Sequence, residues 1–331
     1  MRAKLESWLH SQWTNRGLLA LTMAPLSLAF MGIAAIRRKK ARPVKLPVPV
    51  VVVGNIYVGG TGKTPVTIAL VKELRQRGFN PGIISRGFGR KGESAQMITP
   101  DTPAEIAGDE PLLIALKTRA PVAVGQNRVE AARLLLEKHP ECNIIISDDG
   151  LQHYALGRTV ELAVVGAHGI GNGWVLPAGP LREPPSRLDE VDAIVLNANE
   201  DVLTTHTPRF AATSVLGTAK SLDGNYEYTL DEIAFSGKSV LAAAGIAAPG
   251  RFFAKLRAHD IEGETLELGD HYDFSENPFK DRKEEFILIT GKDAVKCRQI
   301  PEIACDSRVC VVDLIVDIDP YLVDLIVEKI S

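Results

Sequence analysis

The chain has 331 residues, 45% hydrophobic and 24% charged, which is ordinary for a globular protein and enough for a sizeable core, most readily in two domains. Its net charge of −3 is unevenly distributed, because residues 1–45 carry +8 and the remainder carries −11. A basic, apolar N-terminus on an acidic body favours a membrane surface as partner and argues against nucleic acid.

The cysteines indicate a reducing compartment without a structural metal. They show neither CxxC spacing nor a pairing pattern, and they are Cys142, Cys297, Cys305 and Cys310. The sequence also has no internal repeat, no zinc-ligand spacing and no Ser/His/Asp arrangement that would indicate another chemistry.

Residues 17–36 contain no charged side chain and have roughly the length of a membrane span. Trp8 and Trp13 precede this run, and four cations follow it at residues 37–40, as suits headgroup depth. A signal peptide is disfavoured because no small-residue cleavage site follows. A full span, a helix or helical hairpin lying in the cytoplasmic leaflet, and a buried helix of a soluble protein all fit, and Pro25 favours the second. The membrane interpretations leave the body on the cytoplasmic side.

The strongest local signal is a phosphate-binding loop. Residues 48–53 form an apolar, β-branched run typical of a buried strand, and residues 64–77 have helical spacing. The turn between them ends in Gly-Lys-Thr, so its backbone amides and lysine can hold phosphates while the threonine hydroxyl ligates Mg²⁺. The residues predicted to bind the nucleotide are Gly59, Gly60, Thr61, Gly62, Lys63 and Thr64.

The loop departs from the standard phosphate-loop sequence, and these departures limit which nucleotide it is expected to bind. Tyr57 stands where a strict Walker A sequence has glycine, and Val58 replaces the second lysine of the deviant Walker ATPases. A guanine-reading Asn-Lys-x-Asp is absent from the sequence. ATP is therefore favoured over GTP.

A pair of acids, Asp148 and Asp149, follows the strand expected at 143–147, whose centre is apolar. A strand that ends in aspartate is how a P-loop enzyme places a carboxylate beside Mg²⁺. The alternative is an ordinary Asp-Gly turn at the end of a strand. Asp109 precedes the helix expected at 112–117, where an acid caps the helix by default.

The rest of the chain continues the α/β pattern. We expect strands at 82–85, 122–125, 162–165 and 193–196, a helix at 129–138 opened by Arg128, and a functional loop at 166–187. Residues 208–235 are predicted to form a linker hairpin. A second α/β segment has strands at 240–243, 286–290 and 309–314, a helix at 251–259 and a last helix. The predicted parts are an N-terminal membrane-associated segment (1–40), a P-loop kinase domain (41–207), the linker (208–235) and a smaller C-terminal domain (236–331).

Eight blocks in one order resemble the tetraacyldisaccharide 4′-kinase family of lipid A biosynthesis. They are Gly54-Asn55 with Gly59–Pro65, Ser85–Gly87, Gly108–Pro111, Asp148–His153, Leu176–Glu183, Gly250–Phe253, Asp270–Phe274 and Lys292–Lys296. The resemblance covers most of the chain. It implies a P-loop NTPase-type parallel sheet flanked by helices, a smaller C-terminal α/β domain, and an N-terminal anchor on the cytoplasmic face of the inner membrane.

The resemblance also implies an activity. The enzyme would transfer the γ-phosphoryl group of ATP, with Mg²⁺, to the 4′-hydroxyl of an acylated glucosamine disaccharide 1-phosphate, giving the lipid IV-A type product. No obligate protein partner is implied.

Residue roles follow from the matching positions. Lys63 holds phosphates, while Thr64, Asp148 and Asp149 position Mg²⁺. Asp109 matches the family's catalytic acid and His271 its partner, which suits a sugar hydroxyl that needs an oriented base. Candidates for contacting nucleotide or lipid head group are Arg128, His153, Arg182 and Glu183.

Two departures from the family concern single side chains. Gly291 stands where the family usually has Glu, and Phe88 stands where Tyr is expected. Two other function classes fit the residues less well. A membrane-recruited P-loop ATPase switch would lack a lipid acceptor, and a soluble small-molecule kinase would use residues 17–36 only to cover its core.

Overall fold

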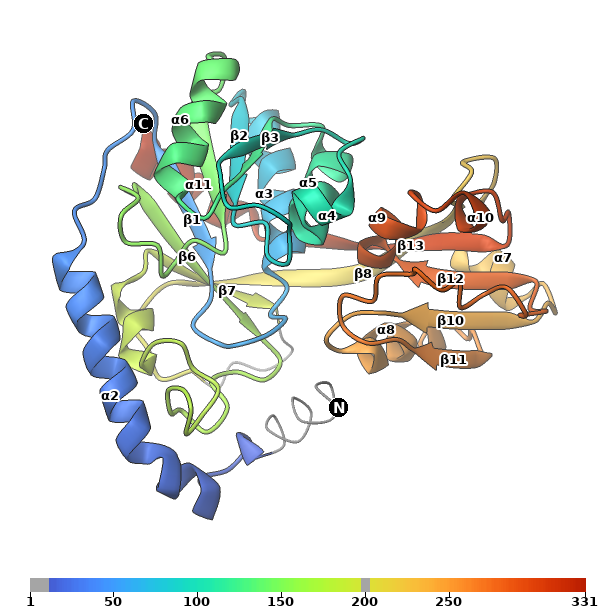
Figure 1. The fold of residues 1–331 in the computed structure, drawn as a ribbon, viewed down its shortest axis with the longest axis horizontal. Helices are drawn as coiled ribbons and strands as arrows, with labels where there is room; N and C mark the ends of the chain where they lie inside the picture. The colour runs from blue at the N-terminus through green and yellow to red at the C-terminus, as the bar shows by residue number, and fades with distance from the viewer. Residues whose placement is uncertain (1–11, 198–202) are drawn as a thin grey trace.

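The computed structural model describes residues 12–197 and 203–331, so Trp8 lies outside the described residues. Figure 1 shows a larger lobe that contains β1 to β7 and a smaller lobe that contains β10 to β12. Strands β8 and β13 run between the two lobes. All strands belong to one sheet, in the order β11-β10-β12-β13-β8-β7-β6-β1-β5-β2-β4-β3, with β9 paired to β8.

The larger lobe is built on a parallel sheet with one antiparallel edge strand, β3. The central strand β1 is buried on both faces, because its β-branched side chains alternate between two cores. The strands are β1 Val50–Gly54, β2 Pro81–Ser85, β3 Gln96–Ile98, β4 Val122–Val124, β5 Ile144–Asp148, β6 Val160–Gly166 and β7 Ala193–Asn197.

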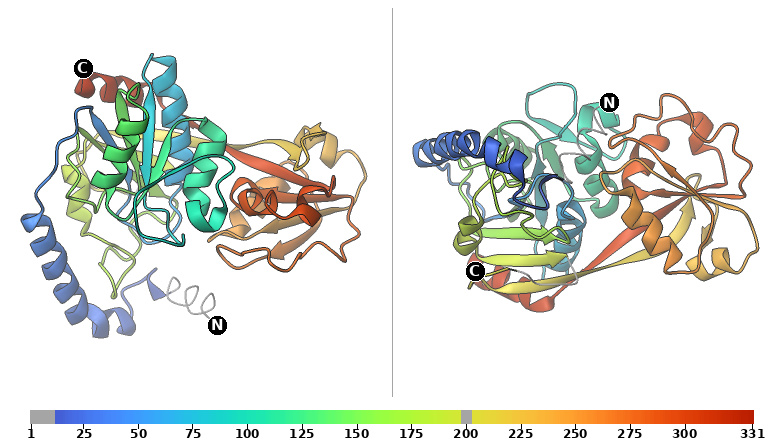
Figure 2. Two further views of the ribbon diagram at one scale, coloured as in Figure 1. Left: turned by 45° about the horizontal axis from the view of Figure 1, so that its top comes forward. Right: turned by 90° about the horizontal axis from the view of Figure 1, so that it is seen from below.

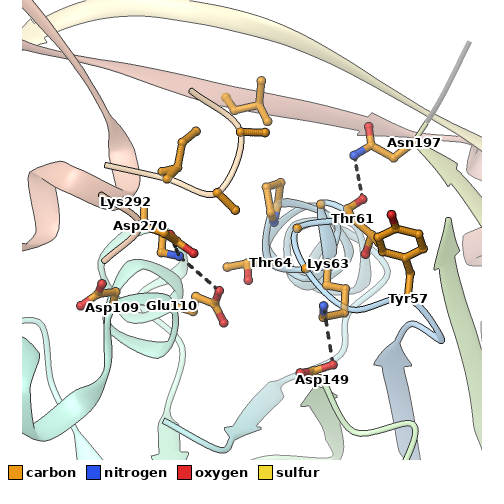
Figure 3. A pocket seen from close by; sticks show the side chains of 18 of the residues that line it. Tyr57, Thr61, Lys63, Thr64, Asp109, Glu110, Asp149, Asn197, Asp270 and Lys292 are labelled. Atoms are coloured by element: carbon orange, nitrogen blue, oxygen red, sulfur yellow. Dashed lines mark hydrogen bonds and ion pairs between the residues drawn. The ribbon is translucent and has the colours of Figure 1, made fainter. Parts of the chain in front are cut away.

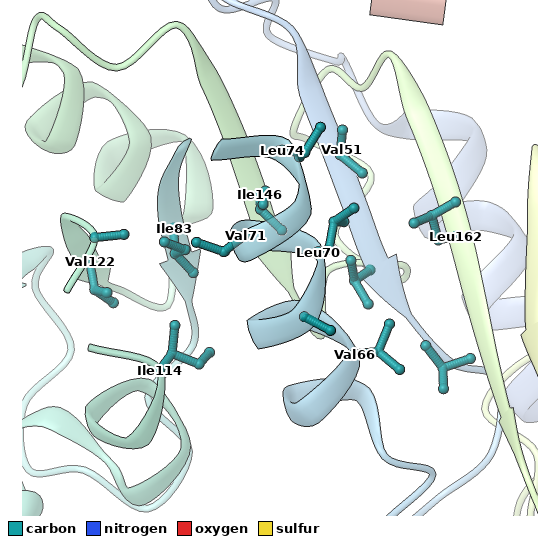
Figure 4. Packing of buried hydrophobic residues seen from close by; sticks show 14 of the residues in the cluster. Val51, Val66, Leu70, Val71, Leu74, Ile83, Ile114, Val122, Ile146 and Leu162 are labelled. Atoms are coloured by element: carbon teal, nitrogen blue, oxygen red, sulfur yellow. The ribbon is translucent and has the colours of Figure 1, made fainter. Parts of the chain in front are cut away.

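Helices cover both faces of this sheet, which confirms the predicted class. One core joins the sheet to α3 (Lys63–Gln76), α5 (Asp109–Thr118) and, from far along the chain, α11 (Pro320–Ile330). Figure 4 shows α3 lying across β1, β2 and β5 with its apolar side chains toward them. The opposite core joins the sheet to α6 (Arg128–Lys138) and the 3₁₀ helix η1 (Pro185–Glu190). A short helix, α4 (Ala104–Ala107), precedes α5.

The smaller lobe repeats the same layering. Parallel strands β10 (Val240–Ala244), β11 (Glu264–Glu267) and β12 (Phe286–Thr290) continue into β13. Helices α7 and α8 cover one face, and α9 and α10 cover the other. These helices span Leu230–Ala234, Pro249–Arg257, Gly291–Cys297 and Pro301–Ala304.

The connection between the lobes contains the expected hairpin, but most of the pairing of its long strand is with another strand. Strand β8 (Arg209–Ser221) pairs with β9 (Glu227–Tyr228) over only two residues, whereas its long antiparallel partner is β13 (Val309–Ile318). Figure 2 shows the two long strands crossing together from one lobe to the other. A local sequence pattern indicates a hairpin but cannot reveal a partner strand whose paired residues lie 89 (Ser221 and Cys310) to 106 (Ala212 and Ile318) positions away.

The chain ends in the larger lobe. We expected the last helix within the C-terminal domain, but β13 carries the chain back, and Leu322, Val323 and Ile326 of α11 join the core beneath α3. The reason is the amphipathic pattern of α11, which needs an apolar face to cover. The proposed domain boundaries otherwise stay a prediction.

The N-terminal apolar segment forms one continuous helix, α2 (Leu18–Lys40), with Pro25 inside it. Only Ala20 and Ser27 are buried, so the helix does not belong to a soluble core, and in the described residues it is not a hairpin. Ser27 Oγ donates to the carbonyl of Val175 at 2.9 Å, which ties α2 to the long loop of the larger lobe. The length and composition of α2 would allow it to cross a membrane. A single such helix near the N-terminus is only weak evidence of a membrane span.

Candidate active site

The phosphate loop connects β1 to α3 and is held from two sides. Gly59 and Gly62 have φ of 112° and 90°, which side-chain-bearing residues rarely adopt. Asn55 Nδ2 donates to Thr61 Oγ1 at 3.0 Å, and Asn197 Nδ2, from the end of β7, donates to the Thr61 carbonyl at 3.1 Å. Because these bonds fix the loop, its amides can be directed at an anion before any ligand arrives (Figure 3).

Lys63 lies beside the carboxylate of Asp149, with 3.6 Å between Nζ and Oδ1. Arg182 Nη1 donates to both carboxylate oxygens of Asp149, at 3.0 and 3.1 Å. Burial by itself raises the pKa of Asp149, but Lys63 and Arg182 outweigh burial and hold the pKa below its ordinary value. Asp149 is therefore an anion at neutral pH.

Asp148 has a different environment although it is the next residue. Its Oδ1 accepts a hydrogen bond from Thr67 Oγ1 at 3.1 Å, while Oδ2 is buried with no partner in the part of the chain that the structure describes. Burial, together with the charges of Glu110 and Asp149, raises the pKa of Asp148 to about 7. The end of β5 thus concentrates negative charge that a cation would relieve.

These residues fit the Mg²⁺ that the sequence implies. Among the described residues no group of three or more His, Cys, Asp or Glu side chains could hold a metal by itself. Mg²⁺ commonly takes only one or two protein carboxylates, with the remaining ligands supplied by phosphates and water. The unpartnered oxygen of Asp148, the carboxylate of Asp149 and the hydroxyl of Thr64 are of the required chemical kind.

Asp109 and His271 meet across the two lobes. Asp109 begins α5, and its Oδ2 lies 2.8 Å from Nδ1 of His271, which follows β11 in the smaller lobe. Lys296 of α9 places Nζ 2.7 Å from the same oxygen. Burial raises the pKa of Asp109, but the hydrogen bonds from His271 and Lys296 reverse this, so the net pKa is below the ordinary value.

A second cation of α9 joins the lobes at the same place. Lys292 Nζ lies 3.6 Å from Glu110 Oε1 of the larger lobe and 3.6 Å from Asp270 Oδ1 of the smaller lobe. Figure 3 shows these three side chains between Asp109 and the phosphate loop. Lys292 Nζ also approaches His271 Nε2 at 3.4 Å.

The predicted loop at 166–187 supplies a third wall of the site. Besides Arg182, which binds Asp149, this wall includes Glu183, which accepts hydrogen bonds from Tyr154 Oη and from Gln152 Nε2 at 3.2 Å. Glu183 is therefore held by protein donors. Its neighbour Gln152 also donates to the carbonyl of Asn55 at 2.9 Å, which connects this wall to the phosphate loop.

A cleft of about 2800 Å³ lies between the lobes and collects most of the predicted residues. Its walls include the phosphate loop, Asp109, Asp149, Arg182 and His271. The cleft extends to α2, where Phe30 lines it. It thus combines a charged end with an apolar end.

Three of the predicted residues are not part of this cleft wall, namely Arg128, His153 and the buried Asp148. Arg128 is buried and donates through Nη1 to the carbonyl of Gly125 at 2.8 Å. His153 Nε2 accepts from the backbone N–H of Arg128 at 3.3 Å, and burial, aided by Arg128, lowers the pKa of His153 to about 4. His153 therefore contacts the start of α6, and its candidate role in ligand contact stays a prediction.

Of the two departures from the family, Gly291 has a local explanation, and nothing in the structure explains Phe88. At Gly291 a Cβ would lie 2.7 Å from Oδ1 of Asp313, so the Asp313 carboxylate occupies that space. The ring of Phe88 lies against the ring of His271, with 5.7 Å between centroids.

Sequence reasoning missed Lys292 and Lys296 as members of the site. Both lie in a block that carries the family resemblance, but no role was assigned to them. Their i, i+4 spacing was the available signal, because it places both side chains on one face of α9.

Comparison with known proteins identifies relatives along the whole chain. The sequence model of a family described as Tetraacyldisaccharide-1-P 4'-kinase matches residues 19–331. A tetraacyldisaccharide 4'-kinase of Janthinobacterium sp. (strain Marseille) is 48% identical over 99% of this chain and 97% of its own length. A protein of the same name from Dechloromonas aromatica (strain RCB) is 42% identical over 98% of each chain.

A solved structure agrees with these relatives. The "apo" form of LpxK from Aquifex aeolicus, described as in complex with ATP, superposes with a TM-score of 0.81 at 28% identity. The match covers 95% of this chain and all of that one. The P-loop fold predicted from the sequence is confirmed.

The different environments of Asp148 and Asp149 predict that replacing each by Asn has opposite effects on the stability of the fold at pH 8. Because the folded pKa of Asp148 is raised, the native state binds more protons than the unfolded state between pH ~4 and ~7, and Asp148 destabilises the fold as pH rises through that window. Without Mg²⁺, Asp148→Asn should raise stability at pH 8 by about 1–3 kcal/mol and by much less at pH 5. Thermal unfolding at the two pH values measures this.

Asp149→Asn is the matched control. The pKa of Asp149 is lowered in the folded state, so the stabilising charge of its carboxylate is present at pH 8. Replacing Asp149 by Asn should therefore lower the stability of the fold at pH 8. A melting temperature of Asp148→Asn at or below that of the unmodified protein at pH 8 would contradict the assignment of an uncompensated carboxylate.

Proposed function

The chain belongs to the tetraacyldisaccharide-1-P 4'-kinase family, and on that premise we propose how its cleft performs the transfer. The γ-phosphoryl group of ATP passes to the 4′-hydroxyl of an acylated glucosamine disaccharide 1-phosphate, giving the lipid IV-A type product of lipid A biosynthesis. The ATPase switch without a lipid acceptor is not favoured, because the relatives along the whole chain are named as kinases.

The phosphate loop binds the triphosphate. The amides of residues 59–62 and the ammonium of Lys63 face the β- and γ-phosphates, as the geometry of a strand–loop–helix phosphate site requires. Asp149 would then exchange part of its contact with Lys63 for a cation. Arg182, which already binds Asp149, keeps that carboxylate in place.

Mg²⁺, when bound with ATP, neutralises the charge that develops on the transferred phosphoryl group. In this chain Thr64, Asp148 and Asp149 would hold it. The support is the buried, unpartnered Oδ2 of Asp148, which no described residue satisfies.

Asp109 acts as general base for the acceptor. The 4′-oxygen forms a bond to the γ-phosphorus, the bond from that phosphorus to the β–γ bridging oxygen breaks, and ADP leaves with the electron pair. The hydroxyl proton passes to the carboxylate of Asp109, which is ionised at neutral pH because its pKa is lowered. His271 orients the carboxylate through its hydrogen bond to Oδ2.

One observation carries this proposal. The Asp109–His271 pair, contributed by different lobes, lines the same cleft as the phosphate loop. An ATPase that only switches partners has no need of a base opposite its γ-phosphate, whereas a sugar kinase does.

The apolar end of the cleft suits a lipid acceptor delivered by a membrane. Large apolar side chains of α2 are exposed, and four cations form the last turn of the helix. We propose that α2 associates with the inner membrane and that the cations keep the two lobes on its cytoplasmic face. Disaccharide acceptors would then enter the cleft beside Phe30.

The activity is tested with purified protein, radiolabelled Mg-ATP and tetraacyldisaccharide 1-phosphate in mixed micelles. The expected product is a lipid with a new phosphomonoester at the 4′ position. Asp109→Asn should lower kcat by about 10²–10⁴-fold, because the base is lost, while the Kd for ATP stays within about twofold. Normal ATP binding by the unmodified protein with no phosphorylated lipid would refute the function, and full turnover by Asp109→Asn would refute the base.

Membrane association is tested on the exposed face of α2. Leu28→Asp places a charge where a 66% exposed leucine stands, and it should weaken partition into phospholipid vesicles by about tenfold or more. Phe235→Asp, at an 83% exposed phenylalanine of the smaller lobe, is the matched control and should leave partition unchanged. Equal partition of the two variants in a vesicle sedimentation assay would argue against α2 as the attachment site.

A further inference from the structure

The two oxygens of the Asp109 carboxylate are treated differently by the protein. Within the described residues, its hydrogen bonds and ion pairs all go to Oδ2, which receives His271 Nδ1 at 2.8 Å and Lys296 Nζ at 2.7 Å. The Asp109 side chain is only 8% exposed and lines the cleft. Oδ1 is thereby the oxygen available to a hydroxyl in the cleft.

Lys292 lies against the second ring nitrogen of His271. An ammonium group has no lone pair, so at the 3.4 Å contact Lys292 is the donor and Nε2 of His271 is the acceptor. The ring proton then resides on Nδ1 and is donated to Asp109. In this arrangement His271 orients the carboxylate of Asp109 through Nδ1.

A cation beside the buried carboxylate of Asp109 offsets its negative charge. The charged side chains that face the Asp109–His271 pair are Glu110 from α5, Asp270 from the loop after β11, and Lys292 and Lys296 from α9. Lys292 lies between Glu110 and Asp270, which leaves Lys296 as the cation of Asp109.

Lys296 is also held in place. Its Nζ donates to the carbonyl of Tyr272 at 2.9 Å, and its side chain is 15% exposed. Because Tyr272 adjoins His271, one short loop orients both groups that contact Oδ2.

We propose that Lys296 is a positioning residue for phosphoryl transfer, which holds Asp109 Oδ2 from the opposite lobe so that an ionised Oδ1 faces the acceptor hydroxyl. This inference rests on the proposed function. It assigns to the smaller lobe the task of keeping the base of the larger lobe ionised, in addition to supplying His271.

The test is the pH profile of kcat/KM for lipid phosphorylation by Lys296→Met and Lys296→Arg. Without the cation, the pKa of Asp109 should rise, so the acid limb of the profile should move to higher pH by roughly 1–2 units. At pH 7, where Asp109 stays ionised, kcat should fall about 10–100-fold because Oδ2 is no longer held in place, with the KM for ATP within about twofold. Lys296→Arg keeps the charge and should keep the acid limb at its original position.

Lys117→Met is the matched control for lobe docking. Lys117 lies about two turns along α5 from Asp109. It forms an ion pair with Asp313 of β13, and this contact also ties α5 to one of the two strands that run between the lobes. The Lys117→Met variant should leave the acid limb of the pH profile at its original position. If Lys296→Met does not fold, as judged by ATP binding, Lys296→Gln replaces it, because it keeps a donor for the Tyr272 carbonyl without the charge.

Each outcome decides a different claim. An unshifted acid limb in Lys296→Met or Lys296→Gln would overturn the inference, and so would equal losses in Lys296→Met and Lys117→Met. Absence of lipid phosphorylation by the unmodified protein would instead refute the proposed function, which separates the two failures.

Discussion

The buried carboxylate of Asp109 is where the two lobes depend on each other. A carboxylate that is largely removed from water needs hydrogen bonds and a counter-charge, or it becomes protonated. Both partners of Asp109, His271 and Lys296, come from the smaller lobe. The apposition of the lobes therefore supplies both groups that hold this carboxylate, which we propose as the base, and a chain with separated lobes would lack that fixed arrangement.

The nucleotide side shows the same use of opposed charges. Asp149 is ionised because Lys63 and Arg182 surround it, whereas the adjacent Asp148 is buried with an unpartnered oxygen. Two neighbouring carboxylates thus differ in their readiness for a cation. The continuous sheet, carried between the lobes by β8 and β13, joins this lobe to the smaller lobe that supplies His271 and Lys296.

Local pattern was sufficient for the phosphate loop and for the acids at the end of β5, because each depends on residues close together in sequence. The pairing of β8 with β13 and the return of α11 to the first core depend on contacts that no local window contains. Asp109 and His271 lie 162 residues apart, so only the family resemblance could join them. The i, i+4 spacing of Lys292 and Lys296 predicts that both side chains lie on one face of a helix. The spacing does not show which residues that face contacts.

The interdependence of the lobes at one carboxylate is tested most directly by a double-mutant cycle on kcat with Asp109→Asn, His271→Asn and the combined variant. If the two side chains act as one unit, the second substitution adds less than about tenfold to the loss caused by the first. Losses that multiply, with each substitution costing as much in the variant background as alone, would show that Asp109 and His271 act independently and would contradict the account.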